Sequence, residues 1–452
     1  MSFPRYPAYK DSGVEWLGDV PEHWEVWKLS HAFTQIGSGT TPKTDNRDYY
    51  EGGDIPWVNT GDFNDRELDE CDKRITELAI VDHSALKTYP PGSLLIAMYG
   101  ATIGKLAILN FAATVNQACC VFAGPSEIAS KFMFYWFLGL REQIISLATG
   151  GGQPNISQDI LRSLRVAIPV LLHQAQIVSF LDHQTSTIDD LIAEQQRLIE
   201  LLQEKRQVVI SHAVTKGLNP NAPMKDSGVE WLGEVPEHWS IKQIKHLCIS
   251  IEQGWSPQCE NEPSEGDAPG VLKVGCVNGG LFRPSENKKL PPELAPVPQY
   301  SVKIGDLLVS RANTKELVGS VAVAAEDFPW LYICDKLYRI TIKPQSSSSK
   351  YLALYLASRE ARGQIELGAS GASPSMQNIS QSVLLDMSIP VPQLDEQESI
   401  RNDITIQCDQ IDQLTAKVME AIRLFQERRS ALISAAVTGQ IDVRGLTEEV
   451  AA

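Results

Sequence analysis

The chain has 452 residues, of which 43% are hydrophobic and 21% are charged, and its formal net charge is −16. This length predicts two or three domains, because a single hydrophobic core stops growing near ~250–300 residues. No apolar run reaches the ~18 residues that a membrane helix needs, and the first residues lack the apolar core of a signal peptide. The acidic balance argues mildly against nucleic acid, but a binding groove needs only a local basic surface.

An arm rich in Trp, Pro and Gly opens the chain and is present twice. The stretch KDSGVEWLGDVPEHW spans Lys10–Trp24, and KDSGVEWLGEVPEHW spans Lys225–Trp239. Fourteen of the fifteen residues are identical, 215 positions apart, and only Asp19 and Glu234 differ. A long internal repeat of this kind decides the prediction of the whole fold.

The motifs that follow the arm recur in the same order in the second half. The counterparts are IPWVNTGD (55–62) and VLKVGCVNGG (271–280), PGSLLIAMYGATIGKLAI (from 91) and IGDLLVSRANTKELVGSVAV (from 304), GGGQPNISQ (150–158) and PSMQNISQ (374–381), and VAIPV (166–170) and MSIPV (387–391). The offset between counterparts grows from 215 to 223 residues. The chain is therefore a tandem duplication of one unit, not a solenoid.

Each unit is predicted to have three parts: the arm, an α/β domain and one long helix. Short apolar runs bounded by Gly, Pro, Asn and Asp predict strands, and segments 130–148 and 349–368 are predicted to be helical. The long helices run from about 174 to 213 and from about 396 to 436, because Pro169 and Pro392 bar an earlier start. We predict an α+β fold with a tandem pseudo-two-fold repeat. The predicted boundaries are 1–172 and 225–393 for the two domains with their arms, 173–215 and 394–439 for the long helices, 216–224 for a linker and 440–452 for a C-terminal tail.

The long helices carry an apolar seam at near-heptad spacing. Its first row is Leu181, Ile188, Gln195, Leu202 and Val209, matched by Ile404, Ile411, Val418, Phe425 and Leu432. A second row is predicted three residues later, at Gln184, Leu191, Leu198, Lys205 and His212, with Leu414 and Ala421 in the other helix and with Ile192 and Ile199 widening the stripe. Helices of ~40 residues are ~60 Å long and need a partner. We expect the two helices to pair as an antiparallel coiled coil, and burial inside a globular domain is the alternative.

No catalytic constellation is visible in the sequence. YGATIGKL fails as a phosphate loop, since only three residues separate Gly100 from Gly104 and Leu106 stands where Ser or Thr is needed. The eight cysteines lack metal spacing, with Cys119 and Cys120 adjacent and the others scattered, so we predict free thiols in a reducing cytoplasm and no metal. The carboxylates of 62–73 have no equivalent in the second half and are read as a solvated turn. These absences indicate a binding protein or scaffold.

The loops of the two middle regions diverge, whereas the arms and long helices are nearly the same. GSGTTPKTDNRDYYEGG (37–53) corresponds to EQGWSPQCENEPSEGDAPG (252–270), and YGATIGK (99–105) corresponds to RANTKELVG (311–319). Repeated surfaces suit identical partners, and divergent loops suit different ones. The pattern therefore predicts two unlike reading heads on one pseudo-symmetric body.

The ordered motifs resemble the specificity subunit of Type I restriction-modification enzymes. The resemblance is carried by SGVEWLGxVPEHW, GDIPWVNTGD, SLLIAMYGATIGKLAIL, GGGQPNIS, IPV before a long helix, and EKRQVVISHAVTKGL. It implies two target recognition domains that each read half of a bipartite double-stranded DNA sequence, with the paired helices as a spacer. It also implies that two methyltransferase subunits and the restriction subunits dock on the chain. S-adenosylmethionine, ATP and magnesium are then expected on those partners, and none on this chain.

Donors and acceptors in or beside the Gly-rich loops are the candidates for DNA contact, because such side chains bind bases and phosphates. Arg311 replaces Met98 or Tyr99 of the first copy and is the strongest candidate for gripping a guanine. Asn155 and Asn378 lie in the NIS motif of both copies, so holding a turn or a phosphate is an alternative for them. The candidates are Thr41, Lys43, Asn59, Tyr99, Lys105, Gln153 and Asn155 in the first unit and Lys273, Asn278, Arg283, Arg311, Asn313, Lys315, Gln377 and Asn378 in the second.

The repeated arms offer Trp16, Trp24, Trp231 and Trp239 as anchors for partner subunits, and packing within the domain is the alternative. Two further functions stay open on the sequence alone. One is a self-contained DNA methyltransferase or nuclease with duplicated recognition domains, which the missing cofactor motifs disfavour. The other is a scaffold that binds only proteins, which the acidic charge slightly favours and the polar loops disfavour.

Overall fold

The computed structural model describes residues 3–149, 154–373 and 375–446, and its contacts divide them into two compact units. Unit 1 contains the described residues up to Gln196 and those from Met419 onward, and unit 2 contains Arg197–Val418. Unit 1 is therefore built from both ends of the chain, and unit 2 from one continuous segment. Each unit holds the arm and the α/β domain of one repeat, together with part of the long helix of each repeat.

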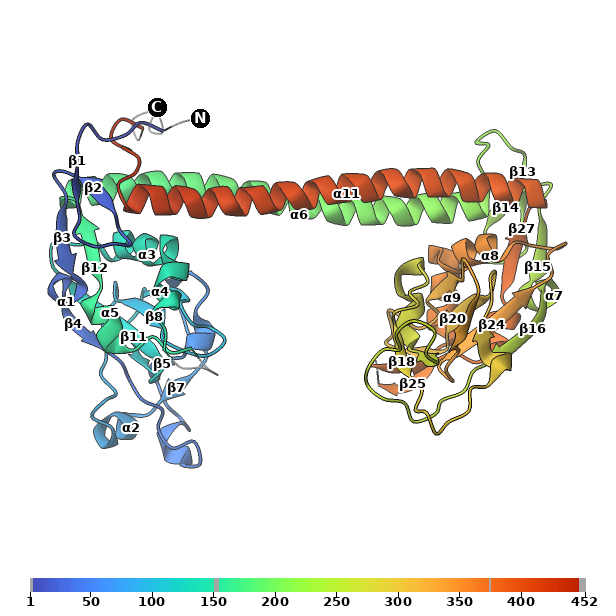
Figure 1. Cartoon of the computed structure of the whole chain (residues 1–452), viewed down its shortest axis with the longest axis horizontal. Helices are drawn as coiled ribbons and strands as arrows, with labels where there is room; N and C mark the ends of the chain where they lie inside the picture. Colours follow the sequence, from blue (N-terminus) through green and yellow to red (C-terminus); the bar gives the residue numbers. More distant parts are fainter. Residues whose placement is uncertain (1–2, 150–153, 374, 447–452) are drawn as a thin grey trace. The chain divides into compact units, whose positions relative to one another are not determined.

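Unit 1 is an α/β head covered by one segment of each long helix (Figure 1). Its sheets have the strand orders β4-β11-β8-β9-β6, β10-β5-β7, β12-β3 and β1-β2. The strands are β1 (Tyr9–Asp11), β2 (Asp19–Pro21), β3 (Glu25–Lys28), β4 (Phe33–Gly37), β5 (Ile55–Val58), β6 (Arg66–Leu68), β7 (Arg74–Ile75), β8 (Leu94–Ala97), β9 (Leu106–Leu109), β10 (Thr114–Val115), β11 (Cys119–Pro125) and β12 (Arg165–Ile168). The short helices are α1 (Leu29–Ala32), η1 (Arg47–Tyr49), η2 (Thr60–Asp62), α2 (Glu77–Asp82), α3 (Ser130–Gly139), α4 (Arg141–Ser146) and α5 (Gln158–Ser163).

Unit 2 repeats the arm hairpin and the two-stranded sheet next to the long helix, but its larger sheets have other strand numbers and it adds a small three-stranded sheet. Its sheets have the orders β16-β24-β20-β22, β18-β17-β23-β19, β21-β26-β25, β15-β27 and β13-β14. The strands are β13 (Met224–Asp226), β14 (Glu234–Pro236), β15 (Ser240–Gln243), β16 (Cys248–Gln253), β17 (Gly270–Leu272), β18 (Asn287–Lys289), β19 (Ser301–Val302), β20 (Leu307–Ser310), β21 (Ala312–Asn313), β22 (Val321–Val323), β23 (Phe328–Tyr332), β24 (Leu337–Ile342), β25 (Ser370–Ser373), β26 (Met376–Asn378) and β27 (Ser388–Val391). The short helices are α7 (Ile244–Leu247), η3 (Val274–Gly280), η4 (Pro298–Tyr300), α8 (Ser349–Leu356), α9 (Arg359–Gly368) and α10 (Gln381–Leu385).

The two long helices are α6 (Leu171–Lys216) and α11 (Leu394–Val437), and each begins two residues after a proline. Both helices start two to three residues before the predicted positions, 174 and 396, and end one to three residues after the predicted ends, 213 and 436. A buried glutamine near the start of each helix ties it to its head. The Gln174 side chain accepts from the Ala129 N–H at 2.7 Å, and Gln397, 223 residues later, accepts from the Ser348 N–H at 2.9 Å. The equivalent bonds show that the same device mounts the helix in both copies.

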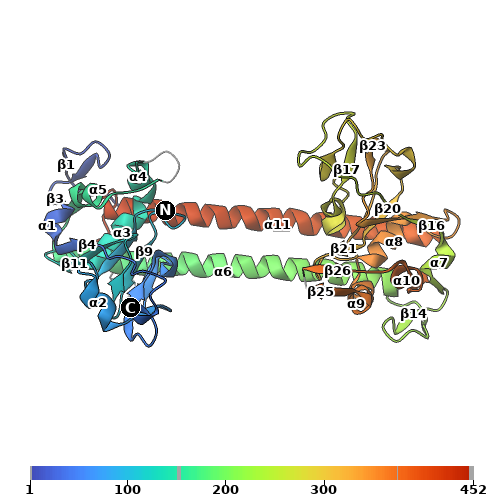
Figure 2. The same cartoon turned by 90° about the horizontal axis from the view of Figure 1, so that it is seen from below.

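α6 and α11 pack along each other in both units, and Figure 2 shows them alongside one another in a second view. Arg206 of α6 pairs with Asp412 of α11 in unit 2, and Arg429 of α11 pairs with Asp189 of α6 in unit 1. The residue numbers add up to 618 in both pairs, so the helices run antiparallel in one register. The predicted antiparallel pairing is confirmed.

The first predicted row of the helix seam is confirmed, and the second is only partly buried. Buried residues of the first row include Leu181, Ile188, Leu202, Ile404, Ile411, Val418 and Leu432. In the row predicted three residues later, Gln184, Leu191 and Ala421 are half-buried, but Leu198 and Leu414 are 39% and 49% exposed. A more continuous row lies four residues after the first and includes the two isoleucines that were expected to widen the stripe; its buried or half-buried members are Thr185, Ile192, Ile199, Cys408, Thr415 and Ile422. Leucines stand three residues after members of the first row, and isoleucines stand four residues after them. Both choices for the second row are therefore similarly apolar, and the sequence pattern alone does not decide between them.

Candidate nucleic-acid interface

The candidate residues of unit 2 gather where β20 runs into the small sheet β21-β26-β25 (Figure 2). Asn313 lies directly opposite Gln377 in the pairing of β21 with β26, so their side chains share one face of the sheet. Asn278 joins them from the turn that closes η3, because its Oδ1 accepts from Asn313 Nδ2 at 3.4 Å. The structure thus brings together three amides from three chain segments.

Arg311 stands at the start of β21 and is tied mainly through its backbone. Its N–H donates to Lys336 O at 2.8 Å, and its carbonyl accepts from the Ile379 N–H at 2.9 Å. The guanidinium Nη1 donates to Asp335 O at 3.4 Å and pairs with no carboxylate among the described residues. A half-buried arginine held in this way keeps donors for a further ligand.

Unit 2 has three further candidate cations, Lys273, Arg283 and Lys315. Arg283 is exposed, and its Nη2 is 3.5 Å from the place that a Cβ on Gly279 would take, next to Asn278. Lys273 caps η3 and is half-buried, and Lys315 is exposed. Exposed cations beside amides suit contacts to phosphate, which position a protein on the duplex without reading its sequence.

In unit 1 the candidates form a chain of polar contacts across three loops. Thr41 Oγ1 donates to Gln117 Oε1 at 2.6 Å, and Asn116 Nδ2, from the residue before Gln117, donates to Asn59 Oδ1 at 3.1 Å. Asn116 and Gln117 were not predicted. The comparison of the two copies could have indicated them, because the dipeptide Asn116-Gln117 after β10 differs from its counterpart Cys334-Asp335, as the other divergent loops do.

The NIS asparagines occupy the same backbone position in both heads. Asn155 forms a bridge with Tyr99, and Asn378 pairs with Ala312. The same backbone frame therefore carries Tyr99 and Gly100 in the first head and Ala312 and Asn313 in the second. Burial raises the pKa of Tyr99, so its hydroxyl keeps its proton and can donate.

The other candidates of unit 1 are more isolated. Lys43 and Lys105 are exposed on the loop after β4 and on the turn between β8 and β9. Gln153 lies outside the described residues. A pocket of approximately 530 Å³ elsewhere in unit 1 is lined mostly by charged residues and includes Asp65, Glu67, Asp182, Asp189 and Asp190. This acidic lining does not suit phosphate.

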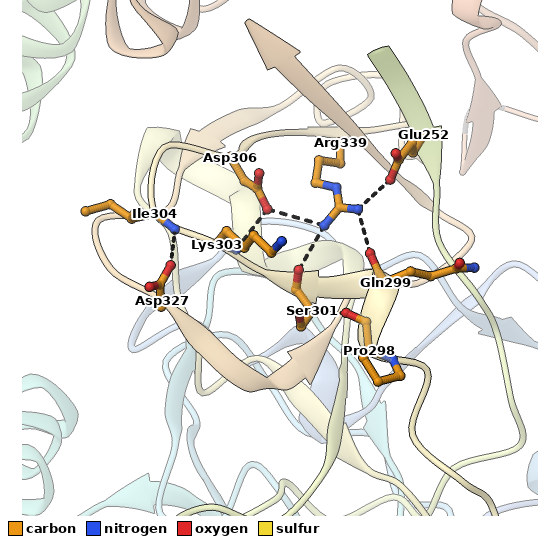
Figure 3. Close-up of polar contacts among 9 residues, drawn as sticks. All are labelled: Glu252, Pro298, Gln299, Ser301, Lys303, Ile304, Asp306, Asp327 and Arg339. Carbon is orange, nitrogen blue, oxygen red and sulfur yellow. Dashed lines mark hydrogen bonds and ion pairs between the residues drawn. The ribbon is translucent and has the colours of Figure 1, made fainter. Parts of the chain in front are cut away.

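A buried arginine that the sequence did not single out joins the two sheets of the second head. Arg339 on β24 donates to Gln299 O at 2.7 Å and to Ser301 O at 2.8 Å, both in the segment of η4 and β19 (Figure 3). It also pairs with Glu252 and with the buried Asp306, whose Oδ2 is 3.5 Å from Nη1. Burial raises the pKa of Asp306 although the guanidinium opposes the shift. β19 belongs to the same sheet as β17, and η3 follows β17 in the chain.

The tryptophans of the two arms divide into a buried and an exposed pair. Trp24 and Trp239 are fully buried in their own units, so they are not available to a partner, in contrast to the prediction. Trp16 and Trp231 are 37% and 38% exposed. The sequence of the arm does not show which of its two tryptophans is buried. In each arm the second tryptophan, Trp24 or Trp239, follows a Pro-Glu-His turn that directs it into the core.

The surroundings of the buried tryptophans differ between the copies. Trp239 Nε1 donates to Glu396 Oε1 at 3.0 Å, whereas the buried Trp24 Nε1 meets no acceptor among the described residues. His173 takes the place of Glu396 in unit 1 and lies 2.8 Å from the Tyr6 hydroxyl. Burial lowers the pKa of His173 to about 4, with Arg444 as the second cause. The site is packed and neutral, which is typical of a structural role.

No group of three or more His, Cys, Asp or Glu side chains in residues 3–149, 154–373 and 375–446 could hold a metal ion. No helix in those ranges is both long and apolar enough to span a membrane.

Comparisons with known proteins agree with this geometry. The family described as Type I restriction modification DNA specificity domain matches residues 21–202 and 236–422. The chain is 31% identical over 241 residues to the Type I restriction enzyme EcoEI specificity subunit of Escherichia coli, a match that spans 53% of this chain and 40% of that protein. It is 23% identical over 436 residues to the Type I restriction enzyme MjaVIII specificity subunit of Methanocaldococcus jannaschii, covering 94% of this chain and 95% of that one.

A solved structure shares the fold over nearly the whole chain. It comes from work on complex assembly and conformational transition of the type I R-M system, and the TM-score is 0.69 at 16% identity. The alignment covers 92% of this chain and 98% of that one. Because the family domain matches both halves of the sequence, the chain belongs to the Type I restriction modification DNA specificity family.

Proposed function

We propose that this chain is the specificity subunit of a Type I restriction-modification complex and that its two heads read the two halves of a bipartite, asymmetric DNA target. The observation that carries the proposal is the double match of the DNA specificity domain on two copies of one backbone frame. Identical frames with different polar side chains suit two half-sites of different sequence. The family is a DNA specificity domain, which disfavours a self-contained methyltransferase or nuclease.

The proposed contacts to DNA fall into two classes. Amides, hydroxyls and Arg311 on the small sheets and turns read base edges, and the exposed cations contact phosphates. The base-reading class is Thr41, Asn59, Tyr99, Asn278, Arg311, Asn313 and Gln377, with Gln153 as a further candidate outside the described residues. The phosphate class is Lys43, Lys105, Lys273, Arg283 and Lys315. Asn155 and Asn378 hold the shared frame, since both keep the same backbone pairing.

The partners in this proposal are two methyltransferase subunits and the restriction subunits, in the cytoplasm. S-adenosylmethionine, ATP and magnesium are bound by those partners. The repeated arms support two equivalent docking sites, because Trp16 and Trp231 are exposed to the same degree on hairpins of nearly identical sequence. Exposed tryptophans are frequent anchors in protein interfaces.

A binding experiment tests the proposal directly. The purified chain is mixed with a pool of randomised duplexes at several salt concentrations, and the bound duplexes are sequenced. We expect two enriched blocks separated by unread base pairs, and an affinity that falls as salt rises. Without partner subunits, the chain should transfer no methyl group from S-adenosylmethionine. Binding that enriches no sequence, or methyl transfer by the chain alone, would overturn the proposal.

A further inference from the structure

The second head differs from the first by amides placed on an otherwise equivalent frame. Tyr99 pairs with Asn155 in the first head, and Ala312 pairs with Asn378 in the second. The next residues outward are Gly100 and Pro154 in the first head but Asn313 and Gln377 in the second. The difference between the heads therefore lies in side chains that can form hydrogen bonds, on top of the same backbone pairing.

Asn278 faces these amides from a rigid corner. Its φ and ψ are −68° and 137°, and those of Gly279 are 76° and 15°. These angles are those of a type II turn, in which the third residue needs a positive φ and is therefore usually Gly. The Arg283 N–H closes the loop by donating to Cys276 O at 2.8 Å. A side chain on such a corner loses little further entropy when it binds.

The hydrogen bonds orient the Asn278 amide. Asn313 Oδ1 accepts from the Thr314 N–H at 2.9 Å, which fixes Asn313 and directs its Nδ2 to Asn278 Oδ1 at 3.4 Å. Gln377 is held in turn by its Nε2, which donates to Ser373 O at 2.7 Å. A primary amide has two N–H donors and two lone pairs. The two N–H groups of Asn278 donate to no acceptor among the described residues, and one lone pair of its Oδ1 accepts from Asn313, so both donors and one lone pair are left for a ligand.

We propose that Asn278 reads the edge of an adenine in the half of the DNA target bound by unit 2, and that Asn313 is its positioning residue. The inference rests on the proposed function. An amide presents one donor and one acceptor side by side, which matches N7 and the N6 amino group of adenine in the major groove. Guanine presents two acceptors there, N7 and O6, and does not match. Arg283 beside Gly279 supplies a positive charge for the adjoining phosphate.

The sharpest test is Asn278→Asp in the full chain. Aspartate has the same size and keeps the acceptor for Asn313 Nδ2, but it removes both donors. We expect the preference for adenine at one position of one block to fall by about 5- to 150-fold, while the other block stays unchanged. The readout is the sequence of duplexes recovered from the randomised pool. Asn278→Ala removes the amide without adding a charge and should lose the same position.

Asn402 provides the matched control, because it is exposed on α11 of the same unit. Asn402→Asp and Asn402→Ala should leave both blocks unchanged, and thermal unfolding should show that all four variants fold. If the Asn278 variants lose a G·C pair, keep both blocks intact, or weaken binding to all sequences equally, the inference is overturned while the proposed function stands. A wild-type chain that enriches no block overturns the proposed function and this inference with it.

Discussion

Arg429 on α11 lies against Asp189 on α6, with Nε 2.9 Å from Oδ1 and Nη2 donating to Oδ2 at 3.3 Å. The repeat offset of 223 residues converts this pair into the second one, since Arg429 corresponds to Arg206 and Asp189 to Asp412. Each arginine comes from one copy and its aspartate from the other. Corresponding residues of the two copies therefore form the same contact once in each unit.

Charge reversal should show that these pairs hold the register of the helices. Arg206→Glu places two negative charges together and should lower stability by ~1 kcal/mol, since the pair is partly exposed. The double variant with Asp412→Arg should recover most of the loss. Lys417→Glu, on an exposed position of α11, is the control. Urea unfolding of the wild type, Arg206→Glu, Asp412→Arg and the double variant gives the coupling, and additive effects of the two substitutions would contradict a direct pair.

The buried tryptophans should respond differently to the same substitution. Trp239→Phe leaves Glu396 without its indole donor, whereas Trp24→Phe removes an N–H group that has no acceptor among the described residues. We expect Trp239→Phe to be the more destabilising by ~1–3 kcal/mol, because the lost cavity volume is the same in both. Thermal unfolding of the two variants measures the difference. Equal losses would mean that the indole bond in unit 2 contributes nothing.

His173 should make unit 1 sensitive to acid. Its pKa is lowered to about 4 in the folded protein, first by burial, then by Arg444 and His23, against Asp442. The unfolded chain binds a proton near pH ~6.5, so the folded state is fully favoured above that pH and loses stability as pH falls toward 4. His173→Gln should flatten this part of the stability profile. His183→Gln, on an exposed position of α6, should leave the profile as it is. A wild-type stability independent of pH between 6.5 and 4 would refute the assignment.

Arg339 and Asp306 should tolerate joint replacement better than single replacement. The corresponding residues of the first copy are Val121 and Ser93. Arg339→Val leaves the buried Asp306 charge unpaired and releases the carbonyls of Gln299 and Ser301, at a cost of ~3–5 kcal/mol. Adding Asp306→Ser should recover part of the loss. Urea unfolding checks this order, and a double variant less stable than Arg339→Val would contradict it.

Much of the fold could be predicted because duplication supplies an internal comparison. The order of motifs gave the two copies, and the prolines at 169 and 392 set the starts of the helices. The helix seam was only half predictable, since Leu198 and Ile199 compete for the same role in neighbouring phases. Which of the two residues is buried depends on how the partner helix packs, and the sequence of one helix carries no information about that packing.

The candidate site was less predictable because its geometry depends on long-range pairing. Asn278, Asn313 and Gln377 were chosen as loop donors, but only the pairing of β21 with β26 places the last two opposite each other. The sequence does not indicate the role of Arg339, since a charged residue within an apolar strand gives no sign of which carbonyls it will contact. The burial of Trp24 is not visible in the arm, because it comes from the C-terminal segment and from His173, both distant in sequence.

The division of the chain also fixes the order in which its parts can be completed during synthesis. Unit 2 uses only Arg197–Val418, whereas unit 1 also needs residues from Met419 onward. Among these, Asp442 donates its backbone N–H to Pro4 O at 2.8 Å. Domains usually fold from the N-terminus as they leave the ribosome. Unit 1 therefore needs residues that are synthesised after the whole of unit 2, so unit 2 can be complete before unit 1. If synthesis stops within α11 after Val418, the released chain contains all of unit 2 but lacks part of unit 1, although unit 1 holds the N-terminal residues.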